Sequence, residues 1–250
     1  MIKYMIPALI IGRKGSTGFP NKNITKFVGR PLMTYPILAA QNSKLVDDIF
    51  ISTDSNEIKK IALSHGLKNI ERPIELATNE ALAEDAFAHG YREIKKISDK
   101  EIEFVVLLFC NGACITPGII DKGIDFLRKD KNNEFDSAAT SSLYNMWSPL
   151  RAKRIVNNTL EPFFPINMFD DASCDRGSQG DCWFADCSAF IVRPKCLEDL
   201  NYGENPFRWM GRKVYPLKQW GGLDLDYEWQ KGQVEFWLRK HGFSETQTPY

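Results

Sequence analysis

Residues 5–23 read Met-Ile-Pro-Ala-Leu-Ile-Ile-Gly-Arg-Lys-Gly-Ser-Thr-Gly-Phe-Pro-Asn-Lys-Asn, an apolar run followed by a basic, glycine-rich loop. The continuous apolar run 5–11 predicts a strand that is buried on both faces, as in a parallel sheet. Ligands of open parallel sheets bind where strands end. Arg13, Lys14 and Lys22 supply positive charge to the loop, while its glycines and hydroxyls can turn donors toward an anion. The segment therefore predicts a phosphate site.

The loop is neither a Walker A motif nor a G-x-G-x-x-G dinucleotide motif, because the lysine and glycine spacing of both is missing. A solvated basic hairpin loop is the alternative interpretation when the loop is taken alone.

Beyond this loop, strand and helix patterns alternate through residue 145, which predicts a Rossmann-like, mostly parallel sheet with helices on both faces. Further strands are expected at 49–52, 103–109 and 137–140, and helices at 31–43, 54–65, 83–97 and 117–128. Asp54 or Ser55 is expected to cap the second helix.

We expect one domain over residues 1–250. Residues 1–145 are predicted to form the core that carries the phosphate site, and 146–220 a lid-like insertion that covers the substrate and returns to the sheet. Short apolar segments separated by polar, aromatic and glycine-rich stretches suggest the insertion. Residues 221–242 are expected to carry a metal element and a helix that ends before Gly242.

Composition excludes several function classes. Lysine plus arginine equals aspartate plus glutamate at 32 each, so no basic excess favours a nucleic-acid partner. No apolar run is long enough to cross a membrane, and the pattern of a signal peptide is missing, which favours a cytoplasmic protein. The six cysteines contain no C-x-x-C pair, so buried, reduced thiols are favoured over a zinc site.

A pair of carboxylates stands near the end of the chain. Asp224 and Asp226 are two positions apart before a predicted helix, and in extended backbone such residues point to the same side. Two carboxylates on one side suit a hard divalent cation such as Mg²⁺. The alternative interpretation is that Asp226 caps the helix while Asp224 is solvated.

The first 80 residues resemble the CMP-sugar synthetases, which are the acylneuraminate and 3-deoxy-octulosonate cytidylyltransferases. That family has A-R-x-G-S-x-x-x-P-x-K-N, then G-x-P-L, S-T-D and R-P-x-E-L-A-T. The matching residues here are Arg13, Gly15, Ser16, Pro20, Lys22, Asn23, Gly29, Pro31, Leu32, Ser52, Thr53, Asp54, Arg72, Pro73, Glu75, Leu76, Ala77 and Thr78. The late element Asp224–Asp226 resembles the family's D-I-D-T-x-x-D, with Tyr227 in place of the threonine.

The resemblance implies transfer of CMP from CTP to an acidic 2-keto-sugar, with release of pyrophosphate, Mg²⁺ as cofactor and a homodimer as assembly. It implies that Arg13 and Lys22 hold the triphosphate and act in catalysis together with Asp226. It also implies a nucleotide site and a metal site. The nucleotide site comprises Arg13, Gly15, Ser16, Lys22, Asn23 and Arg72, and the metal site comprises Asp224 and Asp226. Asp54 is left out of the site because helix capping explains it equally well.

Two segments depart from the family. Residues 109–115 replace its Q-P-T-S-P-L-R stretch, and residues 174–187 replace its acceptor-binding stretch. In the second segment, Arg176 and Gln179 are expected to bind an acceptor carboxylate, because guanidinium groups suit carboxylates. The alternative there is a polar surface loop with Trp183 packed inward. The departures leave open a phosphonate or another sugar acid as acceptor, and also a nucleotide-binding homologue without catalysis.

Overall fold

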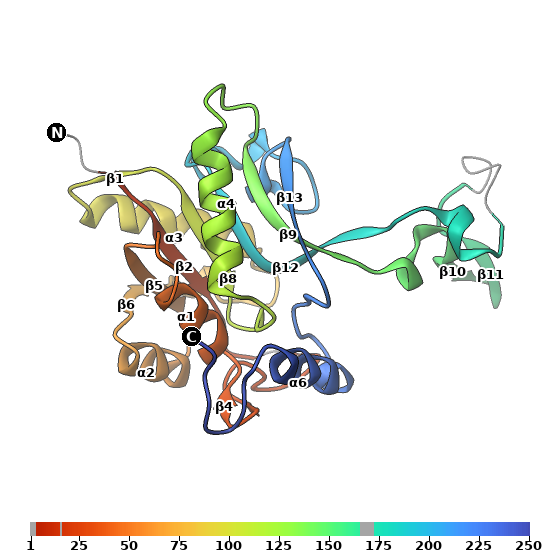
Figure 1. The fold of residues 1–250 in the computed structure, drawn as a ribbon, viewed down its shortest axis with the longest axis horizontal. Helices are drawn as coiled ribbons and strands as arrows, with labels where there is room; N and C mark the ends of the chain where they lie inside the picture. The colour runs from red at the N-terminus through yellow and green to blue at the C-terminus, as the bar shows by residue number, and fades with distance from the viewer. Residues whose placement is uncertain (1–3, 16, 166–172) are drawn as a thin grey trace.

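The computed structural model describes residues 4–15, 17–165 and 173–250, and a seven-stranded sheet forms its centre (Figure 1). The strand order is β13-β9-β12-β8-β2-β5-β6. These strands are β2 (Pro7–Ile11), β5 (Asp48–Thr53), β6 (Lys68–Glu71), β8 (Val105–Phe109), β9 (Ser137–Leu143), β12 (Trp183–Val192) and β13 (Val214–Gln219). Strands β8, β2, β5 and β6 are parallel, β13 is parallel to β9, and β12 runs antiparallel between β8 and β9. The predicted fold class is confirmed.

Helices cover both faces of the sheet. They are α1 (Thr34–Gln41), α2 (Asn56–Ser64), α3 (Ala83–Ile97), α4 (Pro117–Lys129) and α5 (Lys195–Glu198), whereas α6 (Lys231–Lys240) packs outside these two faces. Ala8 and Ile10 of β2 belong to the core cluster that includes side chains of α1, α2 and α4, whereas Leu9 and Ile11 belong to the cluster of α3. This alternation explains why the whole of β2 is apolar.

A third apolar cluster joins the two ends of the chain. It contains Phe19 of the basic loop, Leu225, and Trp237 of α6. Figure 1 shows α6 lying below the sheet, near β4 (Arg30–Pro31). This packing brings the amino-terminal loop and the late carboxylates to the same place.

The segment 146–220, predicted as a lid-like insertion that returns to the sheet, contains β12 and β13. Both strands belong to the central sheet, where Ala189–Val192 and Leu217 are fully buried. What remains is an arm that carries β10 (Lys153–Val156), β11 (Thr159–Pro162) and a 3-10 turn, η5 (Arg176–Gln179). Figure 1 shows this arm extending away from the sheet and not over it.

The remaining strands are short pairs: β1 (Tyr4–Met5) with β7 (Glu101–Ile102), and β3 (Lys26–Phe27) with β4. Ser55, not Asp54, caps α2 by accepting from Ile58 N at 3.3 Å. Among the described residues, no helix is long and apolar enough to span a membrane.

Candidate functional site

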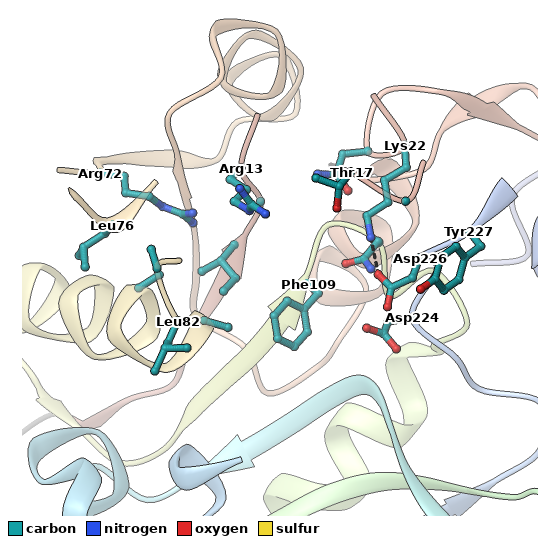
Figure 2. Close-up of a pocket in the computed structure, with 18 residues that line it drawn as sticks. Arg13, Thr17, Lys22, Arg72, Leu76, Leu82, Phe109, Asp224, Asp226 and Tyr227 are labelled. Atoms are coloured by element: carbon teal, nitrogen blue, oxygen red, sulfur yellow. Dashed lines mark hydrogen bonds and ion pairs between the residues drawn. The ribbon is translucent and has the colours of Figure 1, made fainter. Parts of the chain in front are cut away.

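A cavity of about 560 Å³ opens where β2 and β8 end, and Ile11 and Phe109 lie at its floor. Figure 2 shows Arg72, Leu76 and Leu82 on one side, and Lys22, Asp224, Asp226 and Tyr227 on the other, with Arg13 between them. The predicted site residues that line this cavity are Arg13, Lys22, Asn23, Arg72, Asp224 and Asp226. The structure therefore assembles residues from both ends of the chain around one pocket.

The basic loop is held in place by polar contacts with its neighbours. Arg13 donates from Nη1 to Asn79 Oδ1 at 2.6 Å, and the Lys14 backbone N–H donates to Asp54 Oδ1 at 2.8 Å. Asp54 thus ties the loop to the end of β5 instead of capping α2. Gly15 has φ of +80° and borders a smaller adjoining cavity of about 110 Å³, not the main pocket. Ser16 lies outside the described residues.

Arg72 and Asn23 form a polar corner of the pocket. Arg72 donates from Nε to Ser52 Oγ at 3.2 Å and from Nη2 to the Ser52 carbonyl, and burial lowers the pKa of its guanidinium. Asn23 is 8% exposed, and its Oδ1 has no hydrogen-bond partner among the described residues. A buried acceptor without a partner is costly in free energy unless a ligand or water donates to it.

Asp224 and Asp226 point to the same side of the backbone, as predicted from their spacing. Leu225 is fully buried in the third apolar cluster, while Asp224 and Asp226 both line the pocket. Burial, and then the negative charge of Asp226, raise the pKa of Asp224 to about 6. A buried carboxylate whose ionisation is disfavoured by a neighbouring carboxylate forms a site that a cation would stabilise.

Lys22 joins the loop to this element. Its Nζ lies 2.7 Å from Asp226 Oδ1 and donates to the Leu225 carbonyl at 2.6 Å. Asn111, which follows β8, also binds the carboxylate element. Its side-chain Nδ2 donates to the Leu225 carbonyl at 2.9 Å, and its backbone carbonyl accepts from Leu225 N at 3.2 Å. Asp226 does not cap the turn that follows it, because Tyr227 is the N-cap residue of that turn. The backbone N–H groups of Asp226 and Tyr227 both donate to Gln230 Oε1.

An apolar wall was missed by the sequence analysis. Phe109 faces the pocket beside Leu82 and is backed by Phe87 and Trp209, whose ring centroids lie 5.2 and 6.2 Å from its own. Phe109 is the last residue of the strand predicted at 103–109, and Asn111 lies just beyond it. The ends of parallel strands were already expected to meet at the site. The position of both residues at the end of a predicted strand could therefore have marked them as pocket residues.

The structure does not bring Gln179 to this pocket. Gln179 lies in the arm, where its Nε2 donates to the Ser173 carbonyl at 3.1 Å and its Oε1 accepts from Arg151 Nε at 3.3 Å. The side chain of Arg176 lies outside the described residues. Trp183 is 39% exposed and stacks under Lys218 Nζ at 4.8 Å, so it is not packed inward.

The sequence is similar to those of known cytidylyltransferases. A family model described as cytidylyltransferase matches residues 7–159. N-acylneuraminate cytidylyltransferase A of Danio rerio is 30% identical over 124 residues, which are 50% of this chain and 28% of that protein. Pseudaminic acid cytidylyltransferase of Campylobacter jejuni (serotype O:2) is 26% identical over 171 residues, which are 68% of this chain and 70% of that protein. A two-function pseudaminic acid cytidylyltransferase and hydrolase of Helicobacter pylori is 30% identical over 129 residues, and the match spans 24% of its length.

Solved structures show the same fold. A CMP:2-keto-3-deoxy-manno-octonic acid synthetase complexed with CTP superposes with a TM-score of 0.66 at 14% identity, covering 95% of this chain and 99% of that one. A 4-diphosphocytidyl-2C-methyl-D-erythritol synthase from Anaerococcus prevotii superposes with a TM-score of 0.61 at 15% identity, covering 94% and 96%. At these identities the likeness concerns the fold.

Proposed function

Because this chain belongs to the cytidylyltransferase family, we propose that it transfers CMP from CTP to an acidic 2-keto-sugar and releases pyrophosphate. One observation carries the proposal: a single pocket joins the basic loop, through Arg13 and Lys22, to the carboxylates Asp224 and Asp226. Cations for a triphosphate and carboxylates for a metal ion are the two parts that nucleotidyl transfer requires.

The pocket offers separate places for the parts of the nucleotide. Arg13 and Lys22 would face the phosphates, whose negative charge their side chains neutralise through charge-assisted hydrogen bonds. Arg72 and Asn23 would contact the nucleoside at the polar corner. There Asn23 Oδ1, which has no partner in the part of the chain that the structure describes, can accept a hydrogen bond from the ligand. In this proposal Lys22 exchanges its contact with Asp226 for one with a phosphate oxygen.

Asp224 and Asp226 would hold Mg²⁺. The raised pKa of Asp224 supports this assignment, because the charge of a divalent cation would offset both the cost of ionising a buried carboxylate and the repulsion from Asp226. When bound, Mg²⁺ would neutralise phosphate charge and make deprotonation of the attacking hydroxyl less costly.

The side chains of the pocket would act on the phosphates and on the acceptor's orientation. The acceptor hydroxyl would attack the α-phosphorus in line, and Arg13 and Lys22 would stabilise the charge that develops on the departing pyrophosphate. No histidine lies among the described residues that line the pocket, so these side chains contribute electrostatic stabilisation and positioning and not a histidine base.

Phe109, Leu82 and Ala86 present an apolar wall to the pocket. Of these, Phe109 begins the segment 109–115, which replaces the glutamine-containing stretch of the family. We propose that this wall contacts the acceptor, which favours a sugar acid carrying deoxy, methyl or acyl groups. A phosphonate or another sugar acid remains the second candidate for the acceptor, supported by the replaced segment 109–115. A nucleotide-binding protein without catalysis is disfavoured because both charged parts of the pocket are present.

We further propose a cytoplasmic homodimer that serves surface polysaccharide synthesis. The arm supports the dimer, since Ile155, Leu160 and Phe163 expose apolar side chains on it that a second copy would cover. Sedimentation analysis tests this assembly, and a monomer at micromolar concentration would contradict it.

The transfer is tested by mixing the protein with CTP, Mg²⁺ and a panel of keto-sugar acids and phosphonates, and measuring pyrophosphate. We expect release with at least one sugar acid, and its loss in Asp226→Ala. Asp48→Ala is the matched control, because Asp48 lies at the amino end of β5, away from the strand ends that form the pocket, and pairs with Lys68. CTP binding without release for any acceptor would favour the non-catalytic alternative, and normal release by Asp226→Ala would contradict the metal assignment.

A further inference from the structure

A buried carboxylate lies outside the pocket, beneath the segment that carries Asp224 and Asp226. Asp186 of β12 is 4% exposed and receives three hydrogen bonds. Ser142 Oγ of β9 donates to its Oδ2 at 2.7 Å, Gln219 Nε2 of β13 donates to the same oxygen at 2.9 Å, and Ser188 N donates to Oδ1 at 3.1 Å. Burying a carboxylate is costly without such partners, so three adjacent strands are arranged around it.

The shape of β12 turns Asp186 toward this cluster. The pairing of β12 with β9 shifts register between Ala185 and Phe190, and Cys187 has φ of +58°. Bulges of this kind re-aim a side chain and are frequent next to active sites. The left-handed backbone at a non-glycine residue adds local strain, which the surrounding contacts must offset.

Ser142 links this carboxylate to the carboxylate element. Its single hydroxyl proton is used in the bond to Asp186, which leaves the oxygen to accept from Gly222 N at 2.9 Å. Tyr144 OH donates to the Gly222 carbonyl at 2.9 Å, so the residue is held at both of its polar groups. A β-carbon at Gly222 would lie 2.2 Å from Asp186 Oδ2, so only glycine fits at this approach.

Gly222 stands two residues before Asp224, and Leu225 directly follows it. The hydrogen bonds of Leu225 to Asn111 fix the backbone after Asp224, and the hydrogen bonds of Gly222 fix the backbone before it. The backbone that carries the carboxylates is therefore held on both sides of Asp224. The contact at Gly222 is linked through Ser142 to Asp186.

We propose that Asp186 and Ser142 are positioning residues, which act through Gly222 to hold Asp224 and Asp226 in the geometry that binds a divalent cation. This inference rests on the proposed function for the identity of the metal pair. Asp186 and Ser142 do not line the pocket, and their effect is on the orientation of the residues that do.

The test compares Ser142→Ala with Ser141→Ala. Ser141 is the neighbouring residue on β9 and is also buried. Among the described residues its hydroxyl donates only to the Ala139 carbonyl, at 3.3 Å, so Ser141→Ala matches the loss of a hydroxyl without the link to Gly222. Hydrogen exchange of peptides covering 222–226 and binding of Mn²⁺ to the nucleotide-free protein are measured for both variants. We expect exchange about fivefold faster in Ser142→Ala, as for the loss of one hydrogen bond, and Mn²⁺ binding roughly tenfold weaker.

The inference is supported if Ser141→Ala behaves like the wild type while Ser142→Ala shows both faster exchange and weaker Mn²⁺ binding. Equal exchange and equal Mn²⁺ affinity in the two variants would overturn it. If Ser142→Ala does not fold, Tyr144→Phe removes the other bond to Gly222 and is expected to change both measurements in the same direction. A wild-type protein that binds Mn²⁺ but shows no CTP-dependent release of pyrophosphate would contradict the proposed transfer alone, since the serine comparison does not use turnover.

Discussion

Lys22 and Asp226 are 204 positions apart in the chain, and Lys22 Nζ lies 2.7 Å from Asp226 Oδ1. The lysine side chain is 11% exposed and the aspartate side chain 57%, so the ion pair lies at the edge of the pocket with its acidic partner open to ligand. A phosphate group can therefore compete with Asp226 for the lysine without displacing buried structure.

Replacing Lys22 is expected to impair turnover more than folding. Lys22→Met removes the cation proposed to face the phosphates, and we expect pyrophosphate release to fall by about 100-fold or more, as for the loss of one electrostatic contact to a transition state. Steady-state kinetics with CTP check this. Lys26→Met, which removes an exposed lysine on β3, is the control and should retain turnover; equal losses in both variants would contradict a specific role for Lys22.

Asp224→Asn should raise stability while removing metal-dependent activity. The folded pKa of Asp224, about 6, lies above the ordinary value of 3.8, so folding disfavours its ionised form. The resulting loss of stability is fully present above pH 6 and disappears as pH falls below about 4. In the presence of a chelator we expect a Tm increase of roughly 2–5 °C at pH 8 and a much smaller one at pH 4. An increase that is the same at both pH values would contradict the assigned pKa.

Phe109→Gln is expected to change which acceptor is used. Replacing the apolar ring by an amide should lower the preference for deoxy or N-acyl sugar acids over fully hydroxylated ones by roughly tenfold. The measurement is the ratio of kcat/KM values across the acceptor panel. Phe87→Leu is the control, because Phe87 packs behind Phe109 without lining the pocket. A raised KM for CTP with an unchanged acceptor ratio would place Phe109 against the nucleotide instead.

Two glycine substitutions should have opposite effects. Gly222→Ala places a β-carbon 2.2 Å from Asp186 Oδ2 and 2.3 Å from Gln219 Nε2, so it should lower both Tm and turnover. Gly232→Ala, in α6, meets no atom within 4 Å and should raise stability by roughly 0.5–1 kcal/mol through helix propensity. Thermal unfolding of both variants checks this, and an unaffected Gly222→Ala protein would show that the cluster around Asp186 is not rigid.

Much of the parallel half of the fold follows from local pattern. The apolar run 5–11 and the amphipathic segment 83–97 became β2 and α3 almost without change, because burial on two faces and on one face leave different periodicities. The positions of β12 and β13 within the sheet were not predicted. Their apolar segments are short, and their place in the sheet depends on pairing with β9, which the residues of β12 and β13 do not themselves encode.

The sequence alone determined the fold class, the family resemblance, and the chemical character of the basic loop and of the Asp224–Asp226 pair. These properties depend on neighbouring residues, whose spacing sets periodicity, charge and backbone freedom. Only the tertiary structure decided that the loop and the pair share one pocket, that Phe109 faces it, that Gln179 does not, and that Asp186 supports the pair from beneath. Those relationships join residues far apart in the chain, and they arise from apolar burial and strand pairing that bring distant segments into contact.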